Sequence, residues 1–241
     1  NTVSEIIANG IVPGAVEFMD NLAIRAVESS VHAAGFPQDA QALLLIEPDG
    51  LSESLDPLAD RIVKICHGNK AKDVRFAQSE QERKKWWTGR KQAFGAMGKL
   101  SPNYIVLDAT IPRSQLPRML ALIGEIGQKC SLRIANVFHA GDGNMHPLVL
   151  YDARKPGESE KAMQAAMEIL RAGAGIGGTI TGEHGVGLEK RDAMRFLFTP
   201  SDLSVLRSVK AIFDPDGLCN PDKIFPSEEA PRQLSTVSAE V

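Results

Sequence analysis

A glycine-rich polar loop between two apolar segments is the feature that most restricts the fold of this 241-residue chain. Residues 133–138 (RIANVF) and 147–151 (PLVLY) are short apolar runs of the kind that form buried strands. The segment between them, HAGDGNMH at 139–146, is rich in residue types that favour a turn over a helix. A short turn joins two strands in antiparallel fashion, so the sequence predicts a hairpin with His139 and His146 at the same end.

The remaining segments alternate irregularly between helical and strand-like patterns. The sequence predicts helices at 13–34, 54–67, 79–97, 114–129 and 158–173, two further helical segments near the C-terminus, and strands at 42–47, 74–77 and 104–109. No glycine fingerprint of a dinucleotide-binding fold follows the first predicted strand. This order favours the α+β class, with an antiparallel or mixed sheet, over a doubly wound α/β fold.

The composition excludes several classes of protein. Hydrophobic residues make up 43% of the chain and charged residues 24%, as in ordinary globular domains, and no apolar run is long enough to span a membrane. A net charge of −3 disfavours general binding to nucleic acid or anionic membranes. One basic stretch with two tryptophans offers an alternative nucleic-acid site, but acidic residues flank it, and we expect a solvated helix face there. Its basic residues are Arg83, Lys84, Lys85, Arg90 and Lys91.

The cysteine pattern points to a reducing compartment. Cys66, Cys130 and Cys219 are odd in number, far apart and outside any C-x-x-C pair, so we expect neither a disulfide framework nor a thiolate zinc site. Residues 1–10 lack the basic and apolar regions of a secretory signal peptide. The sequence therefore predicts a cytoplasmic protein.

Two glycine-rich loops carry the candidate ligands for a metal. His139 and His146 lie in the first loop, and Glu183 lies in the second, GGTITGEHGVG at 177–187. Two imidazoles and one carboxylate suit Zn, Mn or Fe(II) and leave coordination positions open for a substrate. The pattern is not the H-E-x-x-H of helical zinc proteases. In the alternative interpretation the histidines are hydrogen-bonded turn residues and the carboxylate is solvated.

Three motifs in order resemble a known family. HAGDGNMH at 139–146, GGTITGEHGVG at 177–187 and DPDGLCNPDKIF at 214–225 resemble the C-terminal half of FAD-linked 2-hydroxy-acid oxidoreductases of the vanillyl-alcohol oxidase type, which include D-lactate and D-2-hydroxyglutarate dehydrogenases. The stretches at 13–28 and 89–117 are most similar to the FAD-carrying subunit of bacterial glycolate oxidases within this family. The resemblance covers almost the whole chain.

The resemblance implies a domain organisation and a fold. Residues 1–12 would connect to an upstream FAD-binding domain outside this chain, and residues 13–213 would form a substrate or cap domain. Residues 214–226 would return toward the FAD domain, and we expect the polar residues 227–241 to be a mobile tail. The family fold for this half is a large antiparallel sheet covered by helices, in agreement with the α+β class.

The resemblance also implies roles for individual residues. His139, His146 and Glu183 would hold a divalent metal that grips the substrate carboxylate and 2-hydroxyl, and His184 would be the catalytic base. A third metal-binding histidine is the alternative role for His184. Arg90 would pair with the substrate carboxylate.

The closing motif implies a contact with the flavin. Asn220 and Lys223 match family positions near that cofactor. Cys219 stands where the family usually has Leu and Asp222 where it has Gly, and a plain turn after a helix is the alternative interpretation.

The function implied is that of the substrate-binding half of an FAD-dependent 2-hydroxy-acid dehydrogenase or oxidase. Glycolate or D-lactate would be converted to the 2-oxo acid, with hydride transfer to flavin N5. The expected partners are an iron–sulfur subunit and a second flavin-type subunit, which would place the protein at the membrane periphery. The alternatives are a non-catalytic ligand-binding or subunit-docking module and a metal-dependent hydrolase that uses the same histidines and glutamate.

Overall fold

The computed structural model describes residues 1–227, and the chain forms two compact units, Asn1–Glu183 and His184–Val241. The first unit is built on a seven-stranded sheet in which every pair of neighbouring strands is antiparallel. The main path of the sheet runs β2-β1-β5-β6-β4, and β7 pairs with both β5 and β3. The expected α+β class with a large antiparallel sheet is confirmed.

All of the strands in the described part of the chain belong to the first unit. The strands are β1 (Ala15–Asp20), β2 (Ala42–Glu47), β3 (Asn103–Val106), β4 (Ala109–Thr110), β5 (Arg133–His139), β6 (Asn144–Met145) and β7 (Pro147–Tyr151). The helices are α1 (Thr2–Ala8), α2 (Asn21–Glu28), α3 (Ser52–Gly68), α4 (Glu80–Lys91), α5 (Ala93–Ala96), α6 (Leu116–Cys130) and α7 (Glu158–Gly175), with short 3-10 turns η1 (Met97–Lys99) and η2 (Arg113–Gln115).

The predicted hairpin is present. β5 pairs with β7 through residues 133–136, and the turn between them adds the short strand β6, in which Asn144 lies opposite His139. The expected helices at 54–67, 114–129 and 158–173 and the strand at 42–47 are confirmed within a few residues. The expected helix at 79–97 is divided into α4 and α5, and the strand at 104–109 into β3 and β4.

The helix predicted over 13–34 is wrong in its first half. Residues 15–20 form β1, and only residues 21–28 are helical, with the Asp20 side chain capping the first turn through a 2.9 Å bond from the amide of Ala23. Apolar residues at 16, 18 and 19 fit the spacing of a helix as well as that of a strand. As a strand, β1 pairs with β2 on one side and β5 on the other, and this pairing gives its backbone N–H and C=O groups their hydrogen bonds. Tertiary pairing therefore decided the conformation.

The strand predicted at 74–77 is also absent from the described residues. The segment is irregular and pairs with no strand, and Phe76 is 53% exposed. Val74 instead packs against the apolar cluster that contains Ile62 and Ile65 of α3.

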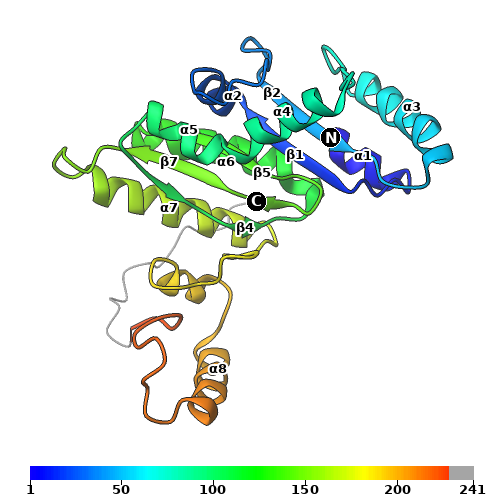
Figure 1. Cartoon of the computed structure of the whole chain (residues 1–241). Coiled ribbons are helices and arrows are strands. Elements are labelled where there is room, and N and C mark those ends of the chain that lie inside the picture. Colours follow the sequence, from blue (N-terminus) through cyan, green and yellow to red (C-terminus); the bar gives the residue numbers. More distant parts are fainter. Residues whose placement is uncertain (228–241) are drawn as a thin grey trace, which may run out of the picture. The chain divides into compact units, whose positions relative to one another are not determined.

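Different helices cover the two faces of the sheet. Ala135 and Val137 of β5 point to one face, where they join a core with residues of α2 and α5. Ile134 and Asn136 point to the other face, beside α6. Figure 1 shows α6 and α7 side by side along the β5–β7 part of the sheet. This two-sided cover fixes the register of β5, because a slip by one residue would exchange its two faces.

The second unit is described over residues 184–227. It contains the 3-10 segment η3 (Arg191–Phe196) and α8 (Pro200–Phe213), which begins with a reciprocal capping box between Thr199 and Asp202. Arg207 of α8 donates a 2.7 Å bond to the carbonyl of Pro226 and stacks over Phe225. The mobile tail expected at 227–241 lies outside the described residues except for Ser227. Within residues 1–227, no helix has the length and apolar character that a membrane crossing requires.

The three cysteines differ in their exposure. Cys66 on α3 and Cys130 on α6 are buried, Cys219 is exposed, and all three are free thiols. Burial raises the pKa of the Cys66 thiol, which further lowers the share of reactive thiolate.

We therefore predict that the native chain shows a single fast-reacting thiol, that of Cys219, toward Ellman's reagent, and three thiols after denaturation. The Cys219→Ser variant should show almost no fast reaction in the native state. Fast modification of this variant without denaturant would contradict the burial of Cys66 and Cys130.

Candidate functional site

The hairpin places two histidine rings against each other. His139 ends β5 and His146 lies between β6 and β7, and their ring centroids are 5.4 Å apart at nearly a right angle. Gly143 closes the turn with φ of +74°, and a Cβ there would lie 2.2 Å from the carbonyl oxygen of Ile111. Glycine at this position therefore allows the turn to pack against the strand β4 and bring the two rings together.

In each ring, Nδ1 lies within hydrogen-bond distance of an acceptor oxygen of the protein. Nδ1 of His146 lies 3.2 Å from the carbonyl oxygen of Leu107, and Nδ1 of His139 lies 2.8 Å from Oε1 of Glu17. A carbonyl or carboxylate oxygen can only accept, so Nδ1 of each ring carries the proton. When a metal is bound, Nε2 of each ring would then be the nitrogen that donates its lone pair.

Both Nε2 atoms face the same carboxylate. Oε1 of Glu183 lies 3.2 Å from Nε2 of His146 and 3.9 Å from Nε2 of His139. His146 is buried, whereas His139 is 36% and Glu183 51% exposed in their side chains. The group is thus anchored on its inner side and accessible on its outer side. The structure brings together the three residues expected to hold a metal.

A buried aspartate positions the backbone of Glu183. Asp108, between β3 and β4, is fully buried and accepts bonds from the hydroxyl of Thr181 at 2.7 Å and from the amides of Gly182 at 2.9 Å and Glu183 at 3.2 Å. A Cβ on Gly182 would lie 2.4 Å from Oδ1 of Asn144. The loop is therefore held against the sheet in two ways: Gly182 has no side chain and can pack closely on Asn144, and the Asp108 carboxylate accepts hydrogen bonds from the loop backbone.

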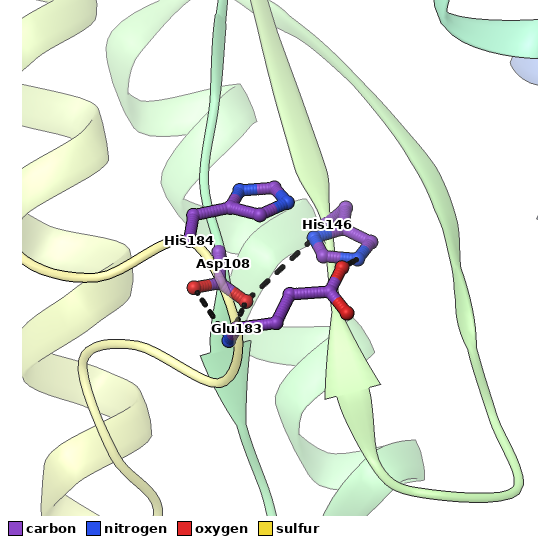
Figure 2. Close-up of side chains that lie close together, drawn as sticks. All are labelled: Asp108, His146, Glu183 and His184. Atoms are coloured by element: carbon purple, nitrogen blue, oxygen red, sulfur yellow. Dashed lines mark hydrogen bonds and ion pairs between the residues drawn. The ribbon is translucent and has the colours of Figure 1, made fainter.

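His184 follows Glu183 directly, so the peptide bond holds it beside this group although it is the first residue of the second unit. Figure 2 shows His184 with Asp108, His146 and Glu183, and one candidate ligand atom from each of the four lies within 4.8 Å of the others. His139 is outside this narrower group. The roles expected for His184, as base or as further ligand, stay predictions.

Arg90 is buried, and it donates from Nη2 to Oε2 of Glu17 at 2.6 Å. Its Nε is buried without a hydrogen-bond partner among the described residues. Sequence reasoning expected this guanidinium to face a substrate carboxylate, and the structure adds an ion pair that links it through Glu17 to His139. The substrate-binding role of Arg90 stays a prediction.

The Glu17 carboxylate is charged despite its burial. Burial opposes its ionisation, but the hydrogen bond from His139 and the charge of Arg90 outweigh that effect and hold the pKa of Glu17 below its ordinary value. The same hydrogen bond raises the pKa of His139 against the opposing effect of burial.

The two residues expected to contact a flavin lie in the second unit. Asn220 is exposed and has φ of +50°, and the amide of Lys223 donates to its carbonyl at 3.3 Å. The next residue, Ile224, donates from its amide to the carbonyl of Gly187 at 2.7 Å. The segment is a backbone-bonded turn, and the flavin contact stays a prediction.

Sequence reasoning missed Glu17 and Asp108. Each is a carboxylate inside an otherwise apolar segment, AVEFM at 15–19 and IVLDA at 105–109. A charged side chain in a buried apolar segment is rare unless it has a partner. The two carboxylates could therefore have been identified from the sequence as buried groups with partners.

We predict that Asp108→Asn lowers the free energy of unfolding by about 1.5–3 kcal/mol, because an amide nitrogen then faces backbone donors that the carboxylate accepted. Urea denaturation with a chelator present measures this. The matched control is Asp39→Asn, since Asp39 pairs with Lys72 at the surface and its loss should leave the free energy of unfolding close to that of the wild type. Equal stability of the two variants would contradict the role given to Asp108.

Comparisons with known proteins agree with this architecture. Residues 1–224 match the family described as FAD linked oxidases, C-terminal domain. The glycolate oxidase subunit GlcD of Escherichia coli K12 is 50% identical over 93% of this chain, and that of Bacillus subtilis is 38% identical over 97%. The chain spans 45% and 50% of the lengths of these relatives.

A solved structure supports the fold. The chain is similar to 4-ethylphenol oxidase from Gulosibacter chungangensis with a TM-score of 0.60 and 15% identity, over 88% of this chain and 48% of that one. The sequence match and the antiparallel sheet lead to one conclusion: this chain belongs to the family of C-terminal domains of FAD-linked oxidases.

Proposed function

We propose that this chain is the substrate-binding half of an FAD-dependent 2-hydroxy-acid dehydrogenase, with glycolate or D-lactate as substrate. The observation that carries the proposal is the convergence of the two histidine Nε2 atoms on Oε1 of Glu183, within a domain of the FAD-linked oxidase family. The names of the two bacterial relatives support glycolate as the first substrate to test.

The donor set fits a divalent metal. Metal–ligand bonds of about 2.0–2.2 Å place neighbouring ligand atoms about 3 Å apart, close to the 3.2 Å between Nε2 of His146 and Oε1 of Glu183. Nδ1 of both rings faces an acceptor of the protein, so the two Nε2 atoms, which face Oε1 of Glu183, would be the nitrogens that bind the metal. His139, His146 and Glu183 would hold Zn, Mn or Fe(II). When bound, such a metal would supply a positive charge that lowers the pKa of the substrate hydroxyl.

The substrate needs positive charge and a base from this chain. The net charge of −3 gives an anionic substrate no general attraction, so local cations have to hold its carboxylate. Arg90 is proposed for this role through a guanidinium nitrogen not engaged by Glu17, since a guanidinium has several donors. His184 is proposed to accept the hydroxyl proton, which leaves the Cα hydrogen free to depart with its electron pair.

FAD would supply the two-electron acceptor for that hydride. Asn220 and Lys223 are the residues of this chain proposed to contact it, and the matched family is that of the C-terminal domains alone, so most FAD contacts are proposed to come from outside this chain. We also propose a cytoplasmic location, with an iron–sulfur subunit and a second flavin-type subunit as partners at the membrane periphery.

Metal analysis tests the proposed site. We predict that the enzyme containing this chain, purified without chelator, carries a divalent metal in near-stoichiometric amount, and that His146→Ala loses most of it because a buried ligand is removed. Elemental analysis by mass spectrometry measures both. His67→Ala, which alters a histidine on α3, should retain the metal. A wild-type enzyme without divalent metal would favour the non-catalytic alternative.

Steady-state kinetics tests the two substrate-facing roles. His184→Ala is predicted to lower kcat by about two to four orders of magnitude, the usual contribution of a general base. Arg90→Ala is predicted to raise KM, because it removes a binding contact. Wild-type kcat in His184→Ala would exclude His184 from the chemistry.

A further inference from the structure

We propose that Glu17 is a positioning residue for the metal site, one that orients His139 and is itself held in place by Arg90. This inference rests on the proposed metal site and extends it to Glu17, for which the family resemblance implied no role. Glu17 would touch neither substrate nor metal and would act through the imidazole of His139.

The sheet register brings the two residues together. Glu17 on β1 lies directly opposite His139 on β5 in the antiparallel pair, so their side chains stand on the same face of the sheet. Oε1 of Glu17 meets Nδ1 of His139 at 2.8 Å. Neither group depends on a flexible loop for this contact, because both belong to paired strands.

The contact determines which nitrogen of His139 is available. An imidazole whose Nδ1–H donates to a carboxylate presents Nε2 as its lone pair, and the ring cannot rotate without losing that bond. In this orientation Nε2 faces Oε1 of Glu183 at 3.9 Å. A carboxylate acceptor also makes the imidazole a more basic ligand. Glu17 would therefore strengthen metal binding without being a ligand.

Arg90 holds the second oxygen of the same carboxylate. Both side chains of the ion pair are more than nine-tenths buried, and Nη2 of Arg90 donates to Oε2 at 2.6 Å. A buried carboxylate is costly without such a partner, so the pair keeps Glu17 charged and in one conformation. His139, which is one-third exposed, is thereby connected to the interior of the domain.

The test measures the affinity for Zn²⁺ in the flavin-loaded enzyme that contains this chain. After removal of bound metal, competition with a chromogenic chelator gives the Kd for the wild type and for Glu17→Gln. The third protein is the double variant Glu17→Met/Arg90→Met. The double variant removes both charges together, which avoids an orphaned buried arginine and favours folding. Circular dichroism and thermal unfolding confirm that each variant is folded.

The matched control is Glu28→Gln, since the Glu28 carboxylate also accepts bonds from backbone amides, those of Ala34 and Phe36, on a neighbouring segment. Its loss should lower stability and leave the Kd for Zn²⁺ unchanged. Visible absorption of Co²⁺-loaded protein adds a spectroscopic readout, because the bands of Co²⁺ depend on its ligands and their geometry.

We expect the double variant to bind Zn²⁺ about 10- to 100-fold more weakly than the wild type, with altered Co²⁺ bands. Glu17→Gln keeps an oxygen that can accept the hydrogen bond from Nδ1–H of His139, so its affinity for Zn²⁺ should fall less than that of the double variant. A folded double variant with the wild-type Kd and Co²⁺ spectrum would overturn the role of Glu17 and leave the proposed metal site intact. A wild-type enzyme that binds no Zn²⁺ would overturn the metal site and this inference with it.

Discussion

The antiparallel pairing of β5 with β1 on one side and with β6 and β7 on the other is the constraint on which the candidate site depends. It places His139 opposite Glu17 and turns the chain so that His146 returns beside His139. Helices on both faces of the sheet prevent β5 from slipping in register. His139 therefore lies on a paired strand and His146 lies between two paired strands, whereas Glu183 reaches the site from a loop.

Two buried carboxylates support the groups that face solvent. Asp108 accepts from the backbone of the loop that carries Glu183, and Glu17 accepts from His139 while paired with Arg90. Buried charges of this kind cost free energy unless every oxygen has a donor. Both carboxylates have several donors, so the same interactions that make them tolerable also fix the positions of the candidate ligands.

Much of this could be predicted from the sequence, and the rest depended on tertiary neighbours. His139 and His146 were found because a short glycine-rich turn keeps them close in sequence and in space. Residues 15–20 were predicted as helix because their apolar residues fit the spacing of a helix as well as that of a strand. Pairing with β2 and β5 makes this segment a strand. Asp108 and Glu17 were missed because their partners lie more than 70 residues away in the sequence.

The most direct test of the account is a crystal structure of the flavin-loaded enzyme grown with Zn²⁺, with anomalous diffraction measured on both sides of the zinc absorption edge. The account predicts one strong anomalous peak at about 2.0–2.2 Å from Nε2 of His139, Nε2 of His146 and a carboxylate oxygen of Glu183. The absence of a peak there, or a peak bound by other side chains, would contradict it.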